Sequence, residues 1–548
     1  MHMPLPLPDP QPPADSHPSA IQSAIPASLV PLLHPAFRML WGVWLTANLC
    51  MWMNDVAAAW MMTSLTREPV WVALVQTAST LPVFLLGLPS GALADIVDRR
   101  RYFILTQFWV AAVAVAMCLV VLFDAMSPGL LLAMTFANGI GLAMRWPVFA
   151  AIVPELVPRA QLPAALGLNG IAMNASRIAG PLIAGAIIAG IGTVYVFLLN
   201  ALLSVAAGCV IMRWRRQHVP DPLGRERLPS AMRVGLSFVR QSARVKAVLA
   251  RIAVFFFHST ALLALLPLVA RGLDGGAGGG AGTFTALLAC MGGGAIVAVL
   301  LLPRVRKAVG RDTLVWYGAL LQALTTLAVA LSTNLYLSMA AMGLSGMAWI
   351  TTANSLSVSI QMALPDWVRA RAMAIYQMAL MGASALGAAA WGHLASLDSV
   401  RDSLLVAAAS GALTMFVVLR LVQDRGEVED LTPATPASTP VADIVPARGR
   451  IVISVIYRID PARAADFIAL MQESRRSRLA LGALGWELLQ DVNDPGLYVE
   501  QIVDESWTEH LRRFYRITEA DVALRERRLA FHIGDAEPEV KRHVVVAS

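Results

Sequence analysis

Three charged side chains stand inside long apolar stretches of the sequence. Asp55 is the only acidic residue in the interior of any such stretch, and Arg145 and Arg177 are the interior arginines. A carboxylate in this setting can bind and release a proton, and a guanidinium can bind an anionic or catecholate-like oxygen. Because a charge at the centre of a bilayer costs about 2.5–3.5 kcal/mol on insertion scales, a residue of this kind usually faces a cavity.

Two asparagines extend the candidate site. Asn48 precedes Asp55 by seven residues and shares its helical face, and Asn174 precedes Arg177 by three residues. We expect Asp55 to couple protons, and we expect Asn174 and Arg177 to contact a bound molecule or to shape their helix. Asn48 is expected to line the same cavity.

Structural alternatives exist for several of these residues. Asp55 could lie near the end of its stretch and reach water or a neighbouring helix. Arg145 could line the cavity or extend toward the membrane interface, where long basic side chains place their charge. His258, which is central in a later stretch, could line the cavity or be packed as a neutral imidazole. The sequence leaves these alternatives open.

The composition favours a polytopic membrane protein. Of the 548 residues, 57% are hydrophobic and 14% are charged, whereas a soluble domain carries about 25% charged residues. A span needs about 20 apolar residues. The sequence predicts twelve spans in an all-α membrane domain of two six-helix halves: 38–63, 70–93, 102–123, 128–152, 164–190, 192–212, 248–270, 284–302, 313–332, 335–358, 371–395 and 402–422.

The loops between these spans predict the orientation. Basic residues gather on one side, for example in 99–101, 213–246 and 304–311, and are sparse on the other. By the positive-inside rule the basic side is cytoplasmic, and so are both termini. The location is then the cell membrane, which is the inner membrane in a Gram-negative organism. The same loops account for the net charge of +7 without nucleic acid as a partner.

Little in the sequence suggests a metal, a cofactor or direct use of ATP. The four cysteines lie in apolar stretches without Cys-x-x-Cys or Cys/His spacing, so we interpret them as packing residues. A phosphate-binding Walker sequence is absent. The expected partners are a small molecule, protons and the lipid bilayer.

Six regions follow from these patterns. We expect a disordered N-terminal tail, a first helical half, a basic cytoplasmic loop, a second helical half, a Pro-rich linker and a soluble C-terminal domain. Their boundaries are 1–34, 35–212, 213–247, 248–423, 424–449 and 450–548. Alternating apolar residues and the turn at 493–496 predict the order β-α-β-β-α-β for the last region, a small α+β fold of the ferredoxin-like type.

Two motifs resemble those of the major facilitator superfamily. The charged turn 91–101 resembles the motif between the second and third spans, with Gly91, Asp95, Arg99 and Arg100 at matching positions; Ile96 and Asp98 depart from it. The stretch 176–185 resembles the antiporter motif of the fifth span, with matches at Gly180, Pro181 and Gly185. With the appended domain, which resembles antibiotic-biosynthesis-monooxygenase domains, the chain resembles the transmembrane secretion effector family, to which the enterobactin exporter belongs.

This resemblance implies a function. It implies proton-coupled export of a small organic molecule, such as a siderophore or a drug, with halves that rock about a central site. Asp95 and Arg99 would form a cytoplasmic gate, with Asp95 facing the N-terminus of the eleventh span. The chain is then not an enzyme. The alternatives are a membrane-tethered oxygenase that acts through the C-terminal domain, and an importer of the same fold; that domain could also dimerise.

Overall fold

The computed structural model describes residues 26–158, 161–214, 228–273, 280–422, 430–434, 449–534 and 536–546. Most of the predicted tail and most of the predicted linker lie outside these described residues. The end of the tail differs from the prediction, because Ala27–Leu33 form the 3₁₀ helix η2. Leu32 packs there against buried side chains of the first half, and this apolar contact orders a segment that the sequence places in a disordered tail.

Twelve long helices form the bundle in the described part of the chain. Several begin where the sequence supplies a start, such as the prolines at the first turn of α1, α2 and α4 and the capping side chain of Asp98 before α3. Their bounds are α1 Pro35–Leu65, α2 Pro69–Ile96, α3 Arg99–Leu122, α4 Pro128–Leu156, α5 Leu162–Gly190, α6 Thr193–Met212, α8 Ala243–Leu273, α9 Ala281–Ala308, α10 Arg311–Leu331, α11 Leu335–Met362, α12 Asp366–Leu397 and α13 Val400–Leu421.

Nine of the described helices are long and apolar enough to cross a membrane. The other three long helices, α1, α4 and α11, carry polar groups in their middles, including Asp55, Arg145 and Asn354. We call the end of the bundle that bears Arg99–Arg101 the basic end, and the opposite end the distal end.

Three large hydrophobic cores hold the described part of the bundle, together with a small cluster in which Met381 of α12 packs against Val83 and Leu142 of the first half. One core lies at the distal end and combines residues of both halves, among them Met62, Val72, Leu265 and Trp391. At the basic end, one core contains only residues of the first half, and another contains only residues of the second half together with α7. The two halves thus share apolar packing at the distal end and have separate cores at the basic end.

Direct contacts between the halves agree with this division. At the distal end the Val70 amide donates to Ser396 Oγ at 3.0 Å, and the Trp60 ring stacks on Phe284 with centroids 5.6 Å apart. Helices α2 and α12 stay close along their length, because a Cβ added at Gly87 would lie 2.9 Å from Met378 Cγ. Helices α2 and α12 therefore join the halves at the distal end and at mid-depth.

The predicted central loop contains a helix that the sequence interpretation missed. Leu228–Gln241 form α7, and α8 begins five residues before the predicted boundary at 248. The segment is strongly basic, which suggested a loop, but Val234, Phe238 and Val239 are buried. Their spacing places them on one apolar face, and the charged residues lie on the other faces.

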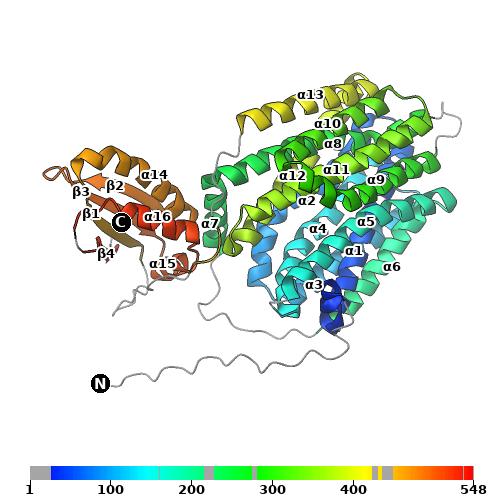
Figure 1. Ribbon diagram of the computed structural model, residues 1–548. Coiled ribbons are helices and arrows are strands. Elements are labelled where there is room, and N and C mark those ends of the chain that lie inside the picture. Colours follow the sequence, from blue (N-terminus) through cyan, green and yellow to red (C-terminus); the bar gives the residue numbers. More distant parts are fainter. Residues whose placement is uncertain are drawn as a thin grey trace.

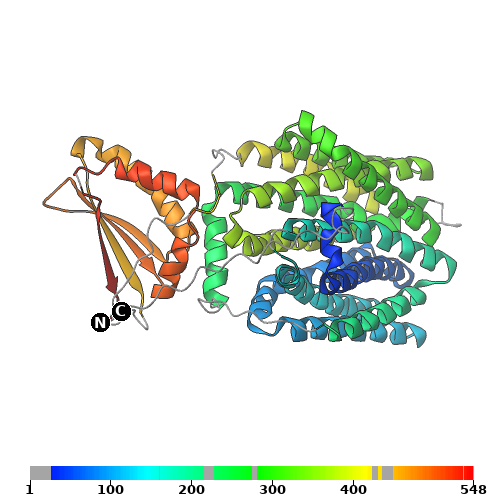
Figure 2. The ribbon, with the colours of Figure 1, turned by 60° about the horizontal axis from the view of Figure 1, so that its bottom comes forward.

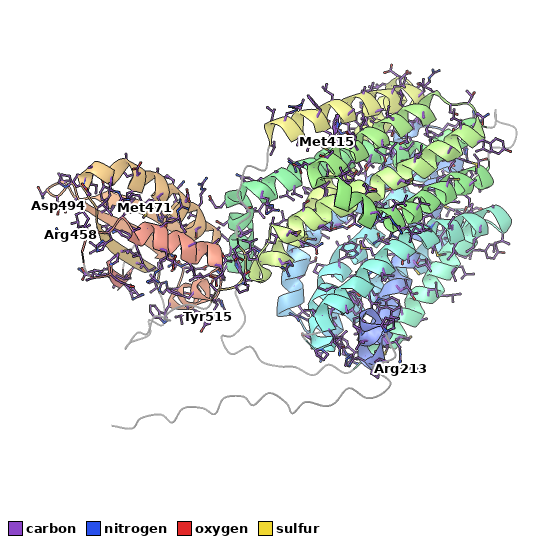
Figure 3. All side chains as sticks on the ribbon, viewed as in Figure 1. Arg213, Met415, Arg458, Met471, Asp494 and Tyr515 are labelled. Carbon is purple, nitrogen blue, oxygen red and sulfur yellow. The ribbon has the colours of Figure 1, made fainter. Side chains whose placement is uncertain are left out.

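The C-terminal domain is a four-stranded antiparallel sheet with helices on one face. Its elements are β1 Ile451–Arg458, α14 Ala464–Ala480, β2 Gly485–Gln490, β3 Leu497–Asp504, α15 Trp507–Phe514, α16 Glu519–Leu529 and β4 Glu539–Val544. The strand order is β2-β3-β1-β4. The helices face the bundle and the sheet lies beyond them (Figure 2). Arg458 and Asp494 lie at the tip remote from the bundle (Figure 3).

This domain docks on the basic end of the second half through α7 (Figure 1). Arg233 of α7 forms an ion pair with Glu505 at 2.7 Å, and Ser237 Oγ donates to the Leu479 carbonyl at 2.8 Å. The guanidinium of Arg516 lies 5.3 Å from the ring centroid of Trp367, near the start of α12. The domain is therefore in contact with α12 itself, which is one of the two helices that join the halves.

A buried carboxylate organises the interior of the C-terminal domain. Glu500 is fully buried, and its two oxygens accept hydrogen bonds from Tyr457, Ser474, Arg478, Trp486 and Arg528. Burial alone would raise the pKa of Glu500, but the charges of Arg478 and Arg528 outweigh it and lower the pKa to about 2. The ionised carboxylate is therefore part of the folded structure.

We predict that Glu500→Gln destabilises the C-terminal domain by about 3–5 kcal/mol, because it leaves the buried Arg528 and the partly buried Arg478 without their charged partner. The matched control is Glu473→Gln, whose exposed pair with Arg527 should contribute about 1 kcal/mol or less. Since the folded pKa lies below the ordinary 4.5, the stabilisation is complete above that value and is lost as the pH falls toward 2. Denaturant unfolding of the purified chain at pH 7 and pH 3 tests the size of the loss and its pH dependence. Equal losses for Glu500→Gln and Glu473→Gln would contradict the prediction.

Candidate functional site

Asp55 lies in the middle part of α1 and is bonded to α2. Ser79 Oγ donates to its carboxylate at 2.8 Å. Two residues before Ser79, Thr77 Oγ1 donates to the Ala385 carbonyl of α12 at 2.9 Å. One short segment of α2 therefore contacts both the carboxylate and the other half of the bundle.

Arg177 lies near the middle of α5, where both halves contribute to its surroundings. Its guanidinium stacks on Trp349 of α11 in the second half, 4.2 Å from the ring centroid. Trp52 of α1 lies on another side, 5.8 Å away. Tyr376 of α12 is also close enough to interact electrostatically with it. Asn174, one turn earlier, donates to the Gly170 carbonyl at 2.9 Å.

The antiporter-like motif brings α5 close to two other helices. A Cβ added at Gly180 would lie 2.5 Å from Trp52 Cβ, so glycine permits the close packing of α5 on α1. A Cβ at Gly185 would overlap the side chain of Thr285 on α9, in the other half. Pro181 lies inside the helix between these two contacts. The small residues thus position Trp52 beside the turn that carries Arg177.

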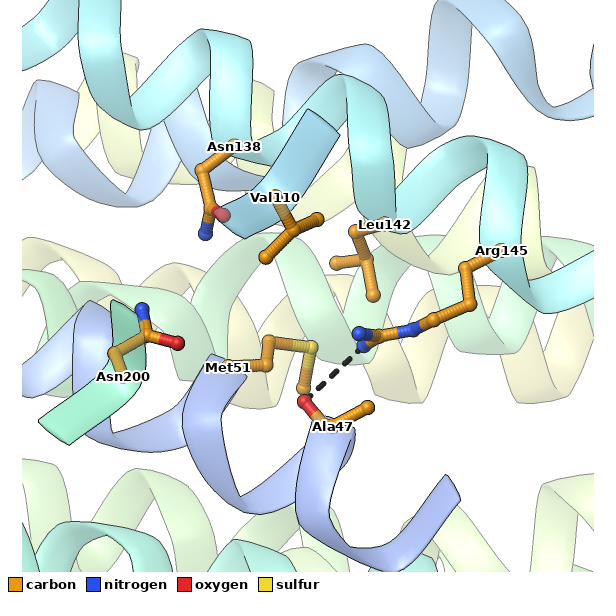
Figure 4. A pocket seen from close by; sticks show the side chains of 7 residues that line it. All are labelled: Ala47, Met51, Val110, Asn138, Leu142, Arg145 and Asn200. Carbon is orange, nitrogen blue, oxygen red and sulfur yellow. Dashed lines mark hydrogen bonds between the residues drawn. The ribbon is translucent and has the colours of Figure 1, made fainter. Parts of the chain in front are cut away.

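Arg145 points into the first half and does not extend to the interface. Its side chain is 2% exposed, and it donates to the Ala47 carbonyl of α1 at 3.2 Å (Figure 4). It borders a cavity barely large enough for a water molecule, together with Asn138 and Asn200. The structure therefore favours an internal position over the interfacial alternative. This cavity lies within the first half, away from Arg177.

Polar side chains link α1 to α6 inside the first half. Asn200 donates to Asn54 Oδ1 at 3.3 Å, and Ser204 donates to Asn200 Oδ1 at 3.2 Å. Asn48 is fully buried; its amide nitrogen donates to the Trp44 carbonyl at 2.7 Å, and its oxygen has no hydrogen-bond partner among the described residues. Asn48 therefore keeps one free acceptor on the same helix as Asp55.

His258 lies within the second half. Its Nδ1 is 2.8 Å from the Val254 carbonyl oxygen, one turn earlier on the same helix. The ring borders a small cavity with Gln322 of α10 and Gly411 of α13, and it lies 5.6 Å from the Trp391 ring. These neighbours all belong to the second half. The packed alternative describes this position better than the prediction that His258 lines a cavity between the halves.

The charged turn after α2 ties together helices of the first half. Arg99 forms an ion pair with Glu155 of α4 at 2.6 Å, and Arg100 donates to the Met212 carbonyl of α6 at 2.6 Å. Asp98, which departs from the family motif, caps α3 by accepting from the Arg101 amide. Gly91 faces Pro147 of α4. The side chain of Asp95 lies outside the described part of the structure, so the gate remains a prediction.

An oxygenase acting through the C-terminal domain would use a tryptophan, a histidine and an asparagine, for which the sequence offers Trp507, His510 and Asn493. Trp507 and His510 are buried, and Asn493 is exposed. His510 is 1% exposed, and its Nδ1 lies 2.7 Å from Asp504. Burial lowers the pKa of His510, although the bond to Asp504 opposes this. Trp507 packs in the core of the domain beside the His510 ring. This geometry favours a structural role for the pair.

Two residues of the site were missed by the sequence interpretation. Ser79 is the partner of Asp55, and Trp349 covers the guanidinium of Arg177. The sequence shows Ser79 inside the predicted span 70–93 and Trp349 in the middle of the span 335–358. It does not show which neighbouring helix either side chain contacts.

Comparisons with known proteins agree with this fold. The staphyloferrin A transporter of Staphylococcus aureus is 23% identical over 332 residues, which cover 60% of this chain and 81% of that protein. Macrolide efflux protein A of Streptococcus pyogenes is 24% identical over 223 residues, which cover 39% of this chain and 54% of that protein. The crystal structure of the nucleoside transporter NupG is similar in fold, with a TM-score of 0.57 at 11% identity over 71% of this chain and all of that chain.

The family assignment rests on a longer match. The model of the transmembrane secretion effector family matches residues 26–548, which include both halves of the bundle and the C-terminal domain. The relatives named above are transporters. The chain is thus a membrane transporter of the major facilitator type, and it belongs to the transmembrane secretion effector family.

Proposed function

We propose that the chain exports a small organic molecule in exchange for protons by alternating access. The observation that carries this proposal is the distribution of the hydrophobic cores. One core joins the halves at the distal end, and separate cores hold each half at the basic end. A bundle packed in this way can open at the basic end without disrupting the core of either half.

The orientation is part of the proposal. Twelve helices would span the membrane: the nine apolar ones, and α1, α4 and α11, whose polar groups face the interior of the bundle. The basic end would be cytoplasmic by the positive-inside rule, together with both termini, and the membrane would be the cell membrane. The described conformation would then be closed to the outside and parted toward the cytoplasm.

Asp55 would couple protons to this movement. In the described conformation its carboxylate accepts from Ser79, two residues from the contact between Thr77 and α12. A protonated Asp55 can donate instead of accept, which changes the bonding of the α2 segment that contacts the other half. Proton binding would thereby favour one arrangement of α2 against α12.

The C-terminal domain would regulate or dimerise the transporter. Its strand order and antiparallel pairing are those of a ferredoxin-like fold, and we propose that it is related to antibiotic-biosynthesis-monooxygenase domains. Its contact with Trp367 would couple it to α12, and the sheet face that its helices leave uncovered would join two copies. The cargo would be a siderophore or a drug, since relatives are named for staphyloferrin A and macrolides.

We predict that everted vesicles containing the chain accumulate cargo when their interior is acidified. A panel with a macrolide and a carboxylate siderophore would identify the cargo by radiolabel uptake. Accumulation that requires the gradient supports export. Efflux from the same vesicles under the same gradient would instead indicate an importer.

We predict that Asp55→Asn reduces gradient-driven uptake to the level of vesicles without the protein, because an amide cannot carry the proton. Exchange of labelled for unlabelled cargo without a gradient should persist, which excludes a folding defect. Asp402→Asn, at the exposed start of α13, is the matched control and should keep full activity. Full gradient-driven uptake by Asp55→Asn would refute the coupling role.

We predict that Val70→Cys with Ser396→Cys forms a disulfide on oxidation, in a background in which the four native cysteines are replaced by alanine. The native contact of 3.0 Å brings the two backbones near the range a disulfide needs. The bridged protein should stop transporting, since the distal end can no longer open, and reduction should restore activity. A bridged protein that transports at the unbridged rate would contradict alternating access.

A further inference from the structure

The guanidinium of Arg177 is charged and has no ionic partner in the described part of the chain. Its Nε and Nη1 atoms are buried without any hydrogen bond. Asp55, the acidic residue in the middle of a neighbouring helix, is bonded to Ser79. A buried ion without a partner costs several kcal/mol, and stacking on an indole returns only about 2 kcal/mol.

The buried arginines Arg145 and Arg251 each donate at least one hydrogen bond to the protein, although their Nε atoms are also unpaired. Arg251 of α8 donates two hydrogen bonds to Asp312 at 2.7 and 3.2 Å. Arg145 donates to the Ala47 carbonyl. Arg177 differs because its side chain donates no hydrogen bond to the described residues: indole rings cover the guanidinium, and Nε and Nη1 are buried without acceptors.

An uncovered stripe leads from the basic end to Arg177. Residues 166, 170, 174 and 177 share one face of α5 by their spacing, and Leu166 and Gly170 are exposed. Arg177, at the end of this stripe, contacts α11 of the other half. The exposed positions Leu166 and Gly170 therefore lie where the two halves part. The facing stripe of α11 carries Ser357 and Gln361, whose side chains are hydrogen-bonded to each other at 3.2 Å.

We propose that Arg177, flanked by Trp52 and Trp349, is the anion-recognition point of the cargo site, and that the cargo is an organic anion with a flat unsaturated group. An oxyanion of the cargo would accept from the N–H groups in the guanidinium plane. The indole rings would pack on the flat group beside it. Because α5 and α1 belong to one half and α11 to the other, a bound anion would contact both halves at mid-depth.

The assignment of Arg177 to a cargo site rests on the proposed transport function, but the tests below measure stability and binding and do not require transport. If an organic anion leaves while protons enter, both movements carry positive charge inward, so an interior-negative membrane potential drives the exchange in addition to the pH difference.

The first test is the stability of the purified chain. Arg177→Met should leave the melting temperature unchanged or higher, because it removes an unpartnered buried charge. Arg251→Met should lower the melting temperature, because it leaves Asp312 without its partner and removes a donor to the Val422 carbonyl. An equal loss in both variants would mean that Arg177 is a structural residue, and it would overturn the proposal.

The second test is equilibrium binding with three matched probes: 2-naphthoate, 2-naphthamide and 2-naphthylmethylammonium. The wild-type chain should bind the anion about 10-fold or more tightly than the neutral amide, since hydrogen bonds to a charged group contribute about 1.5–3 kcal/mol. Arg177→Gln should remove this preference, and Arg177→Lys should retain part of it.

Arg271→Gln is the control for the second test. Arg271 also lies over a tryptophan of α1, 5.3 Å from the Trp60 ring centroid, but at the distal end, so its loss should leave the preference for naphthoate intact. Equal binding of naphthoate and naphthamide by the wild type, or a preference that survives Arg177→Gln, would overturn the proposal. If vesicles show no proton-driven export while the anion preference depends on Arg177, the proposed function fails and the binding site stands.

Discussion

The hydrophobic core that both halves share at the distal end is the constraint on which the rest of the structure depends. It buries residues of α1, α2, α8 and α12 against one another, whereas the basic end has a separate core in each half. The halves can therefore part at the basic end at little cost in buried apolar surface. Parting at the distal end would expose this shared core, so that movement needs a compensating interaction elsewhere in the bundle.

The three interior charges have different kinds of partner, and this difference separates structural from functional roles. Arg145 donates to the Ala47 carbonyl inside the first half. The Asp55 carboxylate accepts from a hydroxyl on α2, the helix that stays close to α12. Arg177 stacks on indoles from both halves and keeps N–H groups without acceptors. Only the last two charges lie where a change of charge or ligand affects the contact between halves.

Much of the architecture could be predicted from composition and periodicity. The directions in which individual side chains point could not. Apolar stretches of about 20 residues predicted where the helices lie, and alternation predicted the strands of the C-terminal domain. The helix α7 was missed because its basic residues obscured a narrow apolar face. The sequence left open whether His258 lines the cavity or is packed, because nearly every position of such a helix is apolar; the residue borders α10 and α13, and tertiary packing sets this orientation.

The central claim, that the two ends of the bundle open alternately, is tested most directly by distances between spin labels. One pair would be placed at the exposed positions Leu166 and Gln361 on the two sides of the basic end, and another at Ile191 and Leu397 at the distal end. On acidification the account predicts that the distance at the basic end shortens while the distance at the distal end lengthens. Distances that both stay constant, or that change in the same direction, would contradict it.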